Sequence, residues 1–250
     1  MMERPIVLIT GGGRGIGAAV ALLAARRGYD LVLNYRSDGQ SAESTAQAAR
    51  AEGARVLTVA ADMAREDDID RLFAAADTFG PLAHVVNNAG VTGRSGRLDA
   101  TSPQVIRTVI DLNVTGAILV ARAGVLRLST RHGGKGGAIV NLSSAAATLG
   151  SPGEYVWYAA SKAAVDGLTY GLGREVAQEG VRVNAVQPGM IDTEIHALST
   201  GDAARIERIR PSVPMQRIGT ADEVAEAVLF LMSPAASYIT ATILRVSGGR

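Results

Sequence analysis

The sequence contains no cysteine. This absence excludes a disulfide framework, thiolate zinc sites, iron–sulfur clusters and cysteine nucleophiles, and it is compatible with a reducing compartment. Aromatic residues are also scarce, with three Phe, six Tyr and one Trp among 250 residues. A chain of this length nevertheless buries roughly three quarters of its unfolded surface, so a large core is expected without cross-links.

An excess of charge of one sign is missing as well. Lys and Arg number 25 and Asp and Glu 24, and no window collects five or six like charges, so no nucleic-acid face is expected. The longest apolar run is about the eight residues from Ala18 to Ala25, far short of the ~20 residues of a membrane span. The N-terminus carries an acid where a signal peptide has a basic region. We therefore expect a soluble, cytoplasmic protein without membrane partners.

Glycine, in contrast, is abundant. The 29 glycines exceed the usual ~7%. They are neither periodic nor accompanied by much proline, which excludes collagen and low-complexity sequence. The positions of the glycines are therefore informative.

Short β-branched runs alternate with longer amphipathic stretches. The predicted strands are Ile6 to Thr10, Leu31 to Tyr35, Arg55 to Ala60, His84 to Asn88, Ala138 to Leu142, Arg182 to Gln187 and Thr242 to Val246. The predicted helices are Ile16 to Arg27, Gln40 to Glu52, Ile69 to Phe79, Pro103 to Ser129, Tyr158 to Glu179 and Ala221 to Met232. Near-continuous apolar strands are typical of parallel strands covered on both faces. The alternation predicts an α/β fold with a doubly wound, seven-stranded parallel sheet.

No linker, repeat or biased tract divides the chain, so a single domain over residues 1–250 is expected. Residues 192–214 interrupt the alternation of strands and helices, because this segment is polar, bounded by proline and only weakly periodic. A loop of this length is usually functional. We expect it to form a substrate lid.

The first predicted strand runs into Thr10-Gly11-Gly12-Gly13-Arg14-Gly15-Ile16-Gly17, and a helix follows at once. Glycines at this position let backbone N–H groups approach a pyrophosphate at the helix N-terminus. A P-loop would need the pattern Gly-x4-Gly-Lys-Ser/Thr, and Ile16 and Ala18 do not supply it. The remaining alternative is a glycine-rich turn without a ligand, but its place after the first strand favours cofactor binding.

The spacing Gly11-x3-Gly15-x-Gly17 resembles the fingerprint of the short-chain dehydrogenases/reductases. The resemblance extends along nearly the whole chain, most closely to 3-oxoacyl-[acyl-carrier-protein] reductases and glucose dehydrogenase-like members. It implies a single-domain, dinucleotide-binding Rossmann fold. The further motifs that carry it are Asn87-Asn88-Ala89-Gly90, Asn113, Ser144, Tyr158-x3-Lys162 and Pro188-Gly189.

Tyr158 and Lys162 are four residues apart in a helical pattern, hence on one face with Cβ atoms ~5–6 Å apart. A free tyrosine, with a pKa of ~10, is a poor base near neutrality, but a nearby ammonium stabilises the phenolate. Tyr155 lacks such a partner, since Ala159 follows it four residues later. The alternative is that Tyr158 and Lys162 merely share a solvated face of the helix. The resemblance implies that Tyr158 donates a proton to a carbonyl in reduction and acts as base in oxidation.

Ser144 ends the fifth predicted strand, where residues of an open α/β sheet face ligands. The resemblance favours Ser144 over Ser143 as the hydroxyl that bonds the reacting oxygen, the alternative being a simple strand cap. Asn113 lies in a helical pattern, where asparagine is a mediocre helix former. The resemblance implies that Asn113 kinks this helix and holds a water that connects Lys162 to solvent. A polar residue on the helix surface is the alternative.

The end of the second strand bears on the choice of cofactor. Rossmann units that bind NAD carry an acid ~20 residues beyond the glycines, and this acid binds the ribose 2′-OH. Here Tyr35 stands at that position, while Arg36 and Arg14 suit a 2′-phosphate. We therefore predict NADP(H) in preference to NAD(H). The alternatives are that both arginines are solvated surface residues, or that nearby Asp38 serves a 2′-OH.

The resemblance implies the other cofactor contacts, among them a hydrogen bond from Lys162 to the nicotinamide ribose. No metal is expected, because His84, His132 and His196 are scattered without ligand spacing. The predicted cofactor-binding residues are Gly11, Arg14, Gly15, Ile16, Gly17, Arg36, Ser37, Asp62, Met63, Asn88, Gly90, Tyr158, Lys162, Pro188, Gly189, Ile191 and Thr193.

The implied activity is an NADP(H)-dependent oxidoreductase that interconverts a small-molecule carbonyl and a secondary alcohol by hydride transfer. A sugar or alcohol dehydrogenase of the same family and a non-catalytic NADP-binding sensor on the same fold are the alternatives. The lid mixes apolar and charged residues and indicates no particular substrate, and a net charge of +1 gives little support to an acidic acyl carrier.

The expected assembly is a homotetramer, because relatives pack the two long helices, here Pro103 to Ser129 and Tyr158 to Glu179, against their copies. Two departures from the family pattern lie near the C-terminus. Ala241 replaces the usual glycine before the last strand, and Ser247 replaces an Asp. Both put the details of the C-terminal contact in question.

Overall fold

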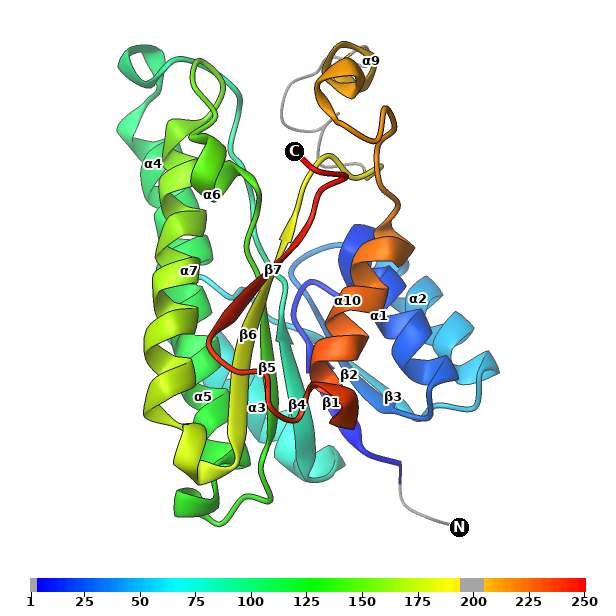
Figure 1. Ribbon diagram of the computed structural model, residues 1–250. Coiled ribbons are helices and arrows are strands. Elements are labelled where there is room, and N and C mark those ends of the chain that lie inside the picture. Colours follow the sequence, from blue (N-terminus) through cyan, green and yellow to red (C-terminus); the bar gives the residue numbers. More distant parts are fainter. Residues whose placement is uncertain (1–3, 194–204) are drawn as a thin grey trace.

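A computed structural model of the chain describes residues 4–193 and 205–250. Its centre is one seven-stranded sheet in the order β3-β2-β1-β4-β5-β6-β7, with every neighbouring pair parallel (Figure 1). The strands are β1 (Ile6–Ile9), β2 (Asp30–Tyr35), β3 (Val56–Ala60), β4 (Leu82–Asn87), β5 (Gly137–Leu142), β6 (Val181–Pro188) and β7 (Thr242–Val246).

Helices cover both faces of this sheet (Figure 1). One face carries α1 (Gly15–Arg26), α2 (Gly39–Ala51) and α10 (Ala221–Met232). The other carries α3 (Glu66–Phe79), α4 (Pro103–Ile110), α5 (Ala117–Leu128) and α7 (Val156–Glu175). Short elements complete the described chain: α6 (Ala146–Leu149), α9 (Arg205–Ile209), η1 (Leu98–Ala100), η3 (Thr130–His132), η4 (Ala177–Glu179), η5 (Arg210–Ser212) and η6 (Pro234–Ala236).

The predicted doubly wound α/β architecture is confirmed. All seven predicted strands are present, and the bounds of β7 and α10 agree to the residue. The largest shift at a helix start is in α3, which begins at Glu66 rather than at Ile69. The first turn of α3 holds Glu66, Asp67 and Asp68, and acidic side chains there are stabilised by the helix dipole. Because the residues of this turn are acidic, the periodicity of apolar residues does not reveal where the helix begins.

The long helix predicted from Pro103 to Ser129 is not uniform. It is α-helical to Ile110, π-helical over η2 (Asp111–Gly116) and α-helical again to Leu128. Single-turn π segments often occur at functional sites, and Asn113 lies inside this one. By length and composition alone the run Pro103–Leu128 could cross a membrane, but α5 packs its buried side against β4 and β5 in the core.

The order of the strands reverses at β1, which pairs with β2 on one side and β4 on the other. Connections from these strands therefore leave toward opposite faces of the sheet. In open α/β sheets, ligands bind in the crevice that this divergence opens at the carboxyl ends of the strands.

Candidate active site

The carboxyl ends of six strands, β1 to β6, border a cleft with a volume of about 930 Å³. Every predicted cofactor-binding residue lies in its wall, and so do Ser144, Tyr158 and Lys162. Asn113 does not line the cleft. The structure thus gathers residues from position 11 to position 193 around one cavity.

The glycine loop is shaped for close backbone approach. Gly11 has φ +64°, a left-handed conformation that glycine adopts without steric cost. A Cβ on Gly17 would lie 2.2 Å from the carbonyl oxygen of Gly11, so only glycine fits there. The α1 N-cap, Arg14, makes no side-chain capping bond, and the first turn holds no acid. These N–H groups and the helix dipole suit an anion such as a pyrophosphate.

Asn34 anchors this loop, although sequence reasoning assigned it no role. It is buried in β2, its Oδ1 accepts from the Gly11 N–H (3.2 Å), and its Nδ2 donates to the Ala61 carbonyl (2.8 Å). A second buried anchor is Thr10, whose Oγ1 accepts from the N–H groups of Asn88 and Ala89, both at 2.9 Å. The sequence did contain a feature that could have identified Asn34, because a polar residue in a buried apolar strand requires hydrogen-bond partners.

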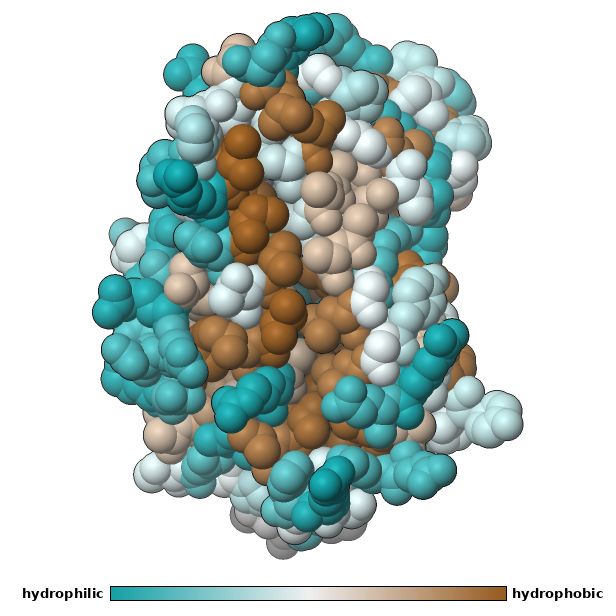
Figure 2. Space-filling view, turned by 90° about the vertical axis from the view of Figure 1, so that its left-hand side faces the viewer, coloured by the Kyte–Doolittle hydropathy of each residue, from teal (hydrophilic) through white to brown (hydrophobic). Residues whose placement is uncertain are grey.

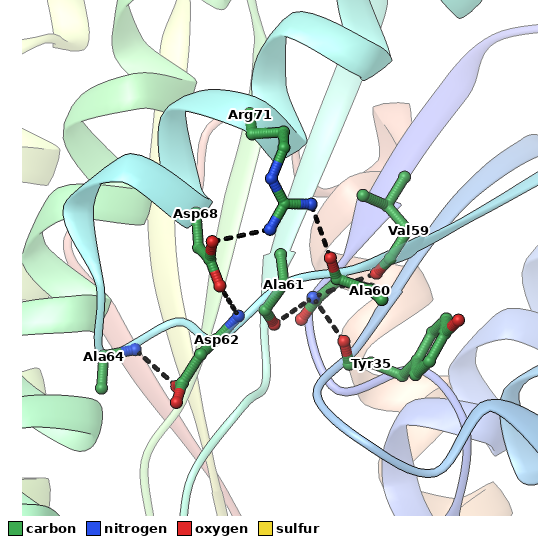
Figure 3. A network of polar contacts seen from close by, with 9 residues as sticks. Tyr35, Val59, Ala60, Ala61, Asp62, Ala64, Asp68 and Arg71 are labelled. Carbon is green, nitrogen blue, oxygen red and sulfur yellow. Dashed lines mark hydrogen bonds and ion pairs between the residues drawn. The ribbon is translucent and has the colours of Figure 1, made fainter.

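A polar network supports the loop after β3 (Figure 3). Asp68 accepts from the Asp62 N–H (2.7 Å) and pairs with Arg71 (2.6 Å), whose guanidinium also donates to the Ala60 carbonyl. The Asp62 carboxylate itself accepts from the Ala64 N–H (3.0 Å). Met63, next to it, is buried in the core while still lining the cleft. The backbone that carries Asp62 is therefore held from both sides.

The end of β2 presents basic side chains rather than an acid. Tyr35 is half-buried, and Arg36 and Ser37 are exposed at the rim of the cleft beside Arg14. Asp38 is the N-cap of α2, and its carboxylate accepts from both the N–H and the hydroxyl of Ser41 (3.0 and 2.7 Å). These two bonds, together with the charge of Arg14, lower the pKa of Asp38.

Tyr158 and Lys162 lie on one face of α7, as predicted. Lys162 is buried, its Nζ donates to the Leu142 carbonyl at the end of β5 (2.7 Å), and it lies 5.8 Å from the centroid of the Tyr158 ring. Burial lowers the pKa of Lys162 to about 8. Burial also raises the pKa of Tyr158, and the Ser144 hydroxyl acts in the opposite direction. The phenol therefore holds its proton near neutrality beside a cationic group.

The two serines after β5 point to different partners. Ser143 is buried and donates to the carbonyl oxygen of Lys162 (3.2 Å). Ser144 is partly exposed in the cleft, accepts from the Ala146 N–H (3.1 Å) and lies next to the Tyr158 phenol. This geometry agrees with the choice of Ser144 over Ser143.

Asn113 is 1% exposed, so the alternative of a residue on the helix surface is wrong. Its Oδ1 accepts from the Val91 N–H (2.9 Å), and its Nδ2 donates to the Val91 carbonyl (2.8 Å) and to the Ser161 hydroxyl (3.0 Å). The π-helical turn thus carries an amide that fastens the loop after β4 to α7. A water held by Asn113 stays a prediction.

Beyond Tyr158 the cleft holds a group of side chains that sequence reasoning did not connect. The Tyr155 ring meets the Tyr158 ring edge-on at 5.6 Å, and the Tyr155 hydroxyl is hydrogen-bonded to Arg205 of α9. Arg205 also pairs with Glu154 (2.7 Å). The Glu154 and Arg205 positions are too far apart in the sequence for a local pattern to reveal the pair. The predicted lid, 192–214, falls partly on residues 194–204, which lie outside the described residues.

No group of three or more His, Asp or Glu residues in the described ranges 4–193 and 205–250 could hold a metal ion. The donor set of the cleft is instead backbone amides at a helix N-terminus, two arginines at its rim, and a phenol with an ammonium. This set fits a phosphorylated dinucleotide.

Known proteins resemble this chain along its whole length. The family model described as enoyl-(acyl carrier protein) reductase matches residues 11–250. An uncharacterized oxidoreductase of Escherichia coli K12, YgfF, is 45% identical over 246 residues, which cover 98% of this chain and 99% of that protein.

Two solved structures share the fold. A short-chain dehydrogenase from Burkholderia cenocepacia, in complex with NADP, has a TM-score of 0.89 at 35% identity and covers 99% of this chain and 97% of its own. A 3-ketoacyl-(acyl-carrier-protein) reductase from Brucella melitensis, complexed with NADH, has a TM-score of 0.91 at 32% identity, with coverage of 100% and 99%. Identity of this extent over the full length, on the same sheet and cleft, makes the chain an oxidoreductase of the short-chain dehydrogenase/reductase superfamily.

Proposed function

We propose that this protein interconverts a carbonyl and a secondary alcohol by hydride transfer with NADP(H), and that Tyr158 is the acid/base. The observation that carries the proposal is the arrangement of Tyr158 between the Ser144 hydroxyl and the buried Lys162 ammonium, in a cleft whose other end is a glycine loop. All seven strands belong to one sheet, in keeping with a single functional domain.

The glycine loop after β1 and the residues Pro188 and Gly189 after β6 would hold the cofactor, whose nicotinamide would supply the hydride for the carbonyl carbon. Tyr158 donates its proton to the carbonyl oxygen, while Ser144 holds that oxygen by a hydrogen bond. Lys162 stabilises the phenolate that Tyr158 becomes, because its positive charge lies near the ring in a buried environment. In oxidation the same phenolate accepts the alcohol proton.

The preference for NADP(H) is supported by the charges at the end of β2. Arg14 and Arg36 border the place where a 2′-phosphate would lie, and Tyr35 supplies no carboxylate against it. Asp38, the acid that could serve a 2′-OH, already caps α2 through Ser41. Arg36→Asp is expected to lower kcat/KM with NADPH by at least tenfold relative to NADH. A ratio equal to that of the wild type would contradict this assignment.

The test of the reaction compares Tyr158→Phe with Tyr155→Phe. The screen uses NADPH with β-ketoacyl thioesters, diketones, quinones and aldehydes, and NADP with sugars and secondary alcohols. Tyr158→Phe is expected to abolish turnover while NADPH binding, followed by fluorescence, is retained. Tyr155→Phe keeps the Tyr158–Lys162 pair and is expected to turn over. A wild type that binds NADPH but converts no compound would favour the non-catalytic sensor instead.

A homotetramer is part of the proposal. Apolar side chains gather in a stripe on the side of the molecule formed by α4, α5 and α7 (Figure 2). Ile118 and Leu126 of α5 and Tyr170 of α7 are each more than 40% exposed. A stripe of this kind on two long helices suits contact with a second copy. Light scattering of the wild type and of Leu126→Glu tests this, with a smaller assembly expected for the variant.

A further inference from the structure

Asp166 lies on the same face of α7 as Tyr158 and Lys162. The three positions are separated by four residues each, so the Asp166 side chain follows Lys162 by one helical turn. Asp166 does not line the cleft and does not reach the reacting atoms.

The Asp166 carboxylate belongs to a chain of polar contacts that joins four elements, α7, β6, β7 and α6. Its Oδ2 accepts from Nε2 of Gln187, a buried residue of β6 (2.7 Å). The Gln187 Oε1 accepts in turn from Nε of Arg245 in β7 (3.2 Å), and Arg245 also bonds the Thr148 hydroxyl. Gln187 directly precedes Pro188 and Gly189 of the cleft wall. Asp166 is therefore held in place by residues far from it in the sequence.

The second carboxylate oxygen, Oδ1, is buried and lacks a hydrogen-bond partner within the described part of the chain. Such a group is costly unless a charge compensates it. Burial raises the pKa of Asp166. The Ser143 hydroxyl, the Gln187 amide and the positive charges of Lys162 and Arg245 act in the opposite direction and favour the carboxylate.

The groups around the Lys162 ammonium show how the Asp166 carboxylate can affect its protonation. The end of β5 supplies the Leu142 carbonyl, and η2 supplies the Asn113 amide, which faces Gly90 together with Lys162. The helix α7 supplies Tyr158 and Asp166. Of the described residues, Asp166 is the carboxyl group that favours the charged form of Lys162, whereas burial favours the neutral amine.

We propose that Asp166 is a positioning residue that keeps Lys162 in its ammonium form, through its place one turn along α7 and its anchoring by Gln187 and Arg245. This inference rests on the proposed function only for its consequence in catalysis. The inference itself concerns the protonation state of Lys162, which can be measured without turnover.

The test exploits the fact that the chain has only two lysines, Lys135 and Lys162. Protein labelled with ¹³C-lysine gives two Cε signals, and their pH titration reports each pKa separately. Asp166→Asn removes the charge while the amide oxygen can still accept from Gln187. We expect the pKa of Lys162 to fall by about one unit or more in this variant, whereas exposed Lys135 is unchanged. Asp166→Glu keeps the negative charge, so the pKa of Lys162 in this variant is expected to lie close to its wild-type value.

Glu175→Gln is the matched control, because Glu175 is an exposed acid at the end of the same helix. It is expected to leave the titration of Lys162 unaltered. In carbonyl reduction, Asp166→Asn is expected to move the alkaline limb of the kcat profile to lower pH. A folded Asp166→Asn protein whose Lys162 titrates as in the wild type would overturn the inference. A wild type without turnover would overturn only the proposed function, since the titration remains measurable.

Discussion

Nζ of Lys162 donates a 2.7 Å hydrogen bond to the carbonyl oxygen of Leu142. Leu142 is the last residue of β5, and Ser144 follows two positions later. This bond therefore ties the helix that carries Tyr158 to the strand end that carries Ser144. The relative positions of the phenol, the hydroxyl and the ammonium depend on it.

Lys162→Met is expected to lower kcat for carbonyl reduction by about a hundredfold or more, because the phenolate that forms loses its stabilising charge. It also leaves the Leu142 carbonyl without its donor, at a cost of about 1–3 kcal/mol in the free energy of unfolding. Steady-state kinetics and urea denaturation measure the two effects. A kcat within threefold of the wild type would show that Lys162 has no part in the chemistry.

Gly17→Ala is expected to weaken NADPH binding by at least tenfold, since a Cβ at 2.2 Å from the Gly11 carbonyl must displace the phosphate loop or α1. The control is Gly171→Ala in α7, where a Cβ would meet no atom within 4 Å. Titration of NADPH fluorescence measures both variants. Equal affinity in the two would mean that the loop does not bind the pyrophosphate.

Stability is expected to depend on His84 in acid. Burial, the larger cause, and the charge of Arg182 lower the pKa of His84 to about 4, and its Nδ1 accepts from the Ala138 N–H (3.1 Å). The unfolded chain, with a pKa near 6.5, takes up the proton first as the pH falls. The resulting stability is thus present above pH 6.5 and lost toward pH 4, by at most about 3 kcal/mol.

Urea denaturation from pH 7 to pH 4 checks this expectation. His84→Gln removes the titrating ring and is expected to flatten the fall in the free energy of unfolding over that range. The exposed His132 supplies the control, because His132→Gln is expected to keep the wild-type slope. Identical slopes for all three proteins would exclude His84 as the source.

Ala241→Gly is expected to stabilise the protein by about 0.5–1 kcal/mol. Ala241 has φ +55°, a left-handed conformation that disfavours a residue with a Cβ, and the hydrogen bond from its N–H to the Val183 carbonyl (2.7 Å) holds the backbone there. Ala48→Gly, at an exposed position inside α2, is expected to destabilise by a similar amount. Chemical denaturation of both variants measures the difference, and a destabilised Ala241→Gly would refute the assignment of strain.

Ala241, where the family has a glycine, illustrates what could be predicted from the sequence and what could not. The family pattern placed a glycine there, and the structure retains a glycine-like conformation despite the alanine. The sheet and helices around it form as predicted because their apolar patterns are strong. The start of α3 was not predictable from the hydrophobic period, since its acidic first turn has no apolar residue. The irregularity of the helix at Asn113 was expected from the family resemblance alone, since a π segment leaves no hydrophobic period of its own.

By itself, the sequence determined the alternating strands and helices, the glycine loop and the Tyr158–Lys162 spacing. Each of these is a local pattern, carried by contiguous residues or by a separation of four. The tertiary structure alone decided that Asn34 anchors the glycine loop, that Glu154 meets Arg205, and that Asp166 is held by Gln187. These contacts join residues at least 21 positions apart, so they exist only once parallel strands bring distant segments to one edge of the sheet.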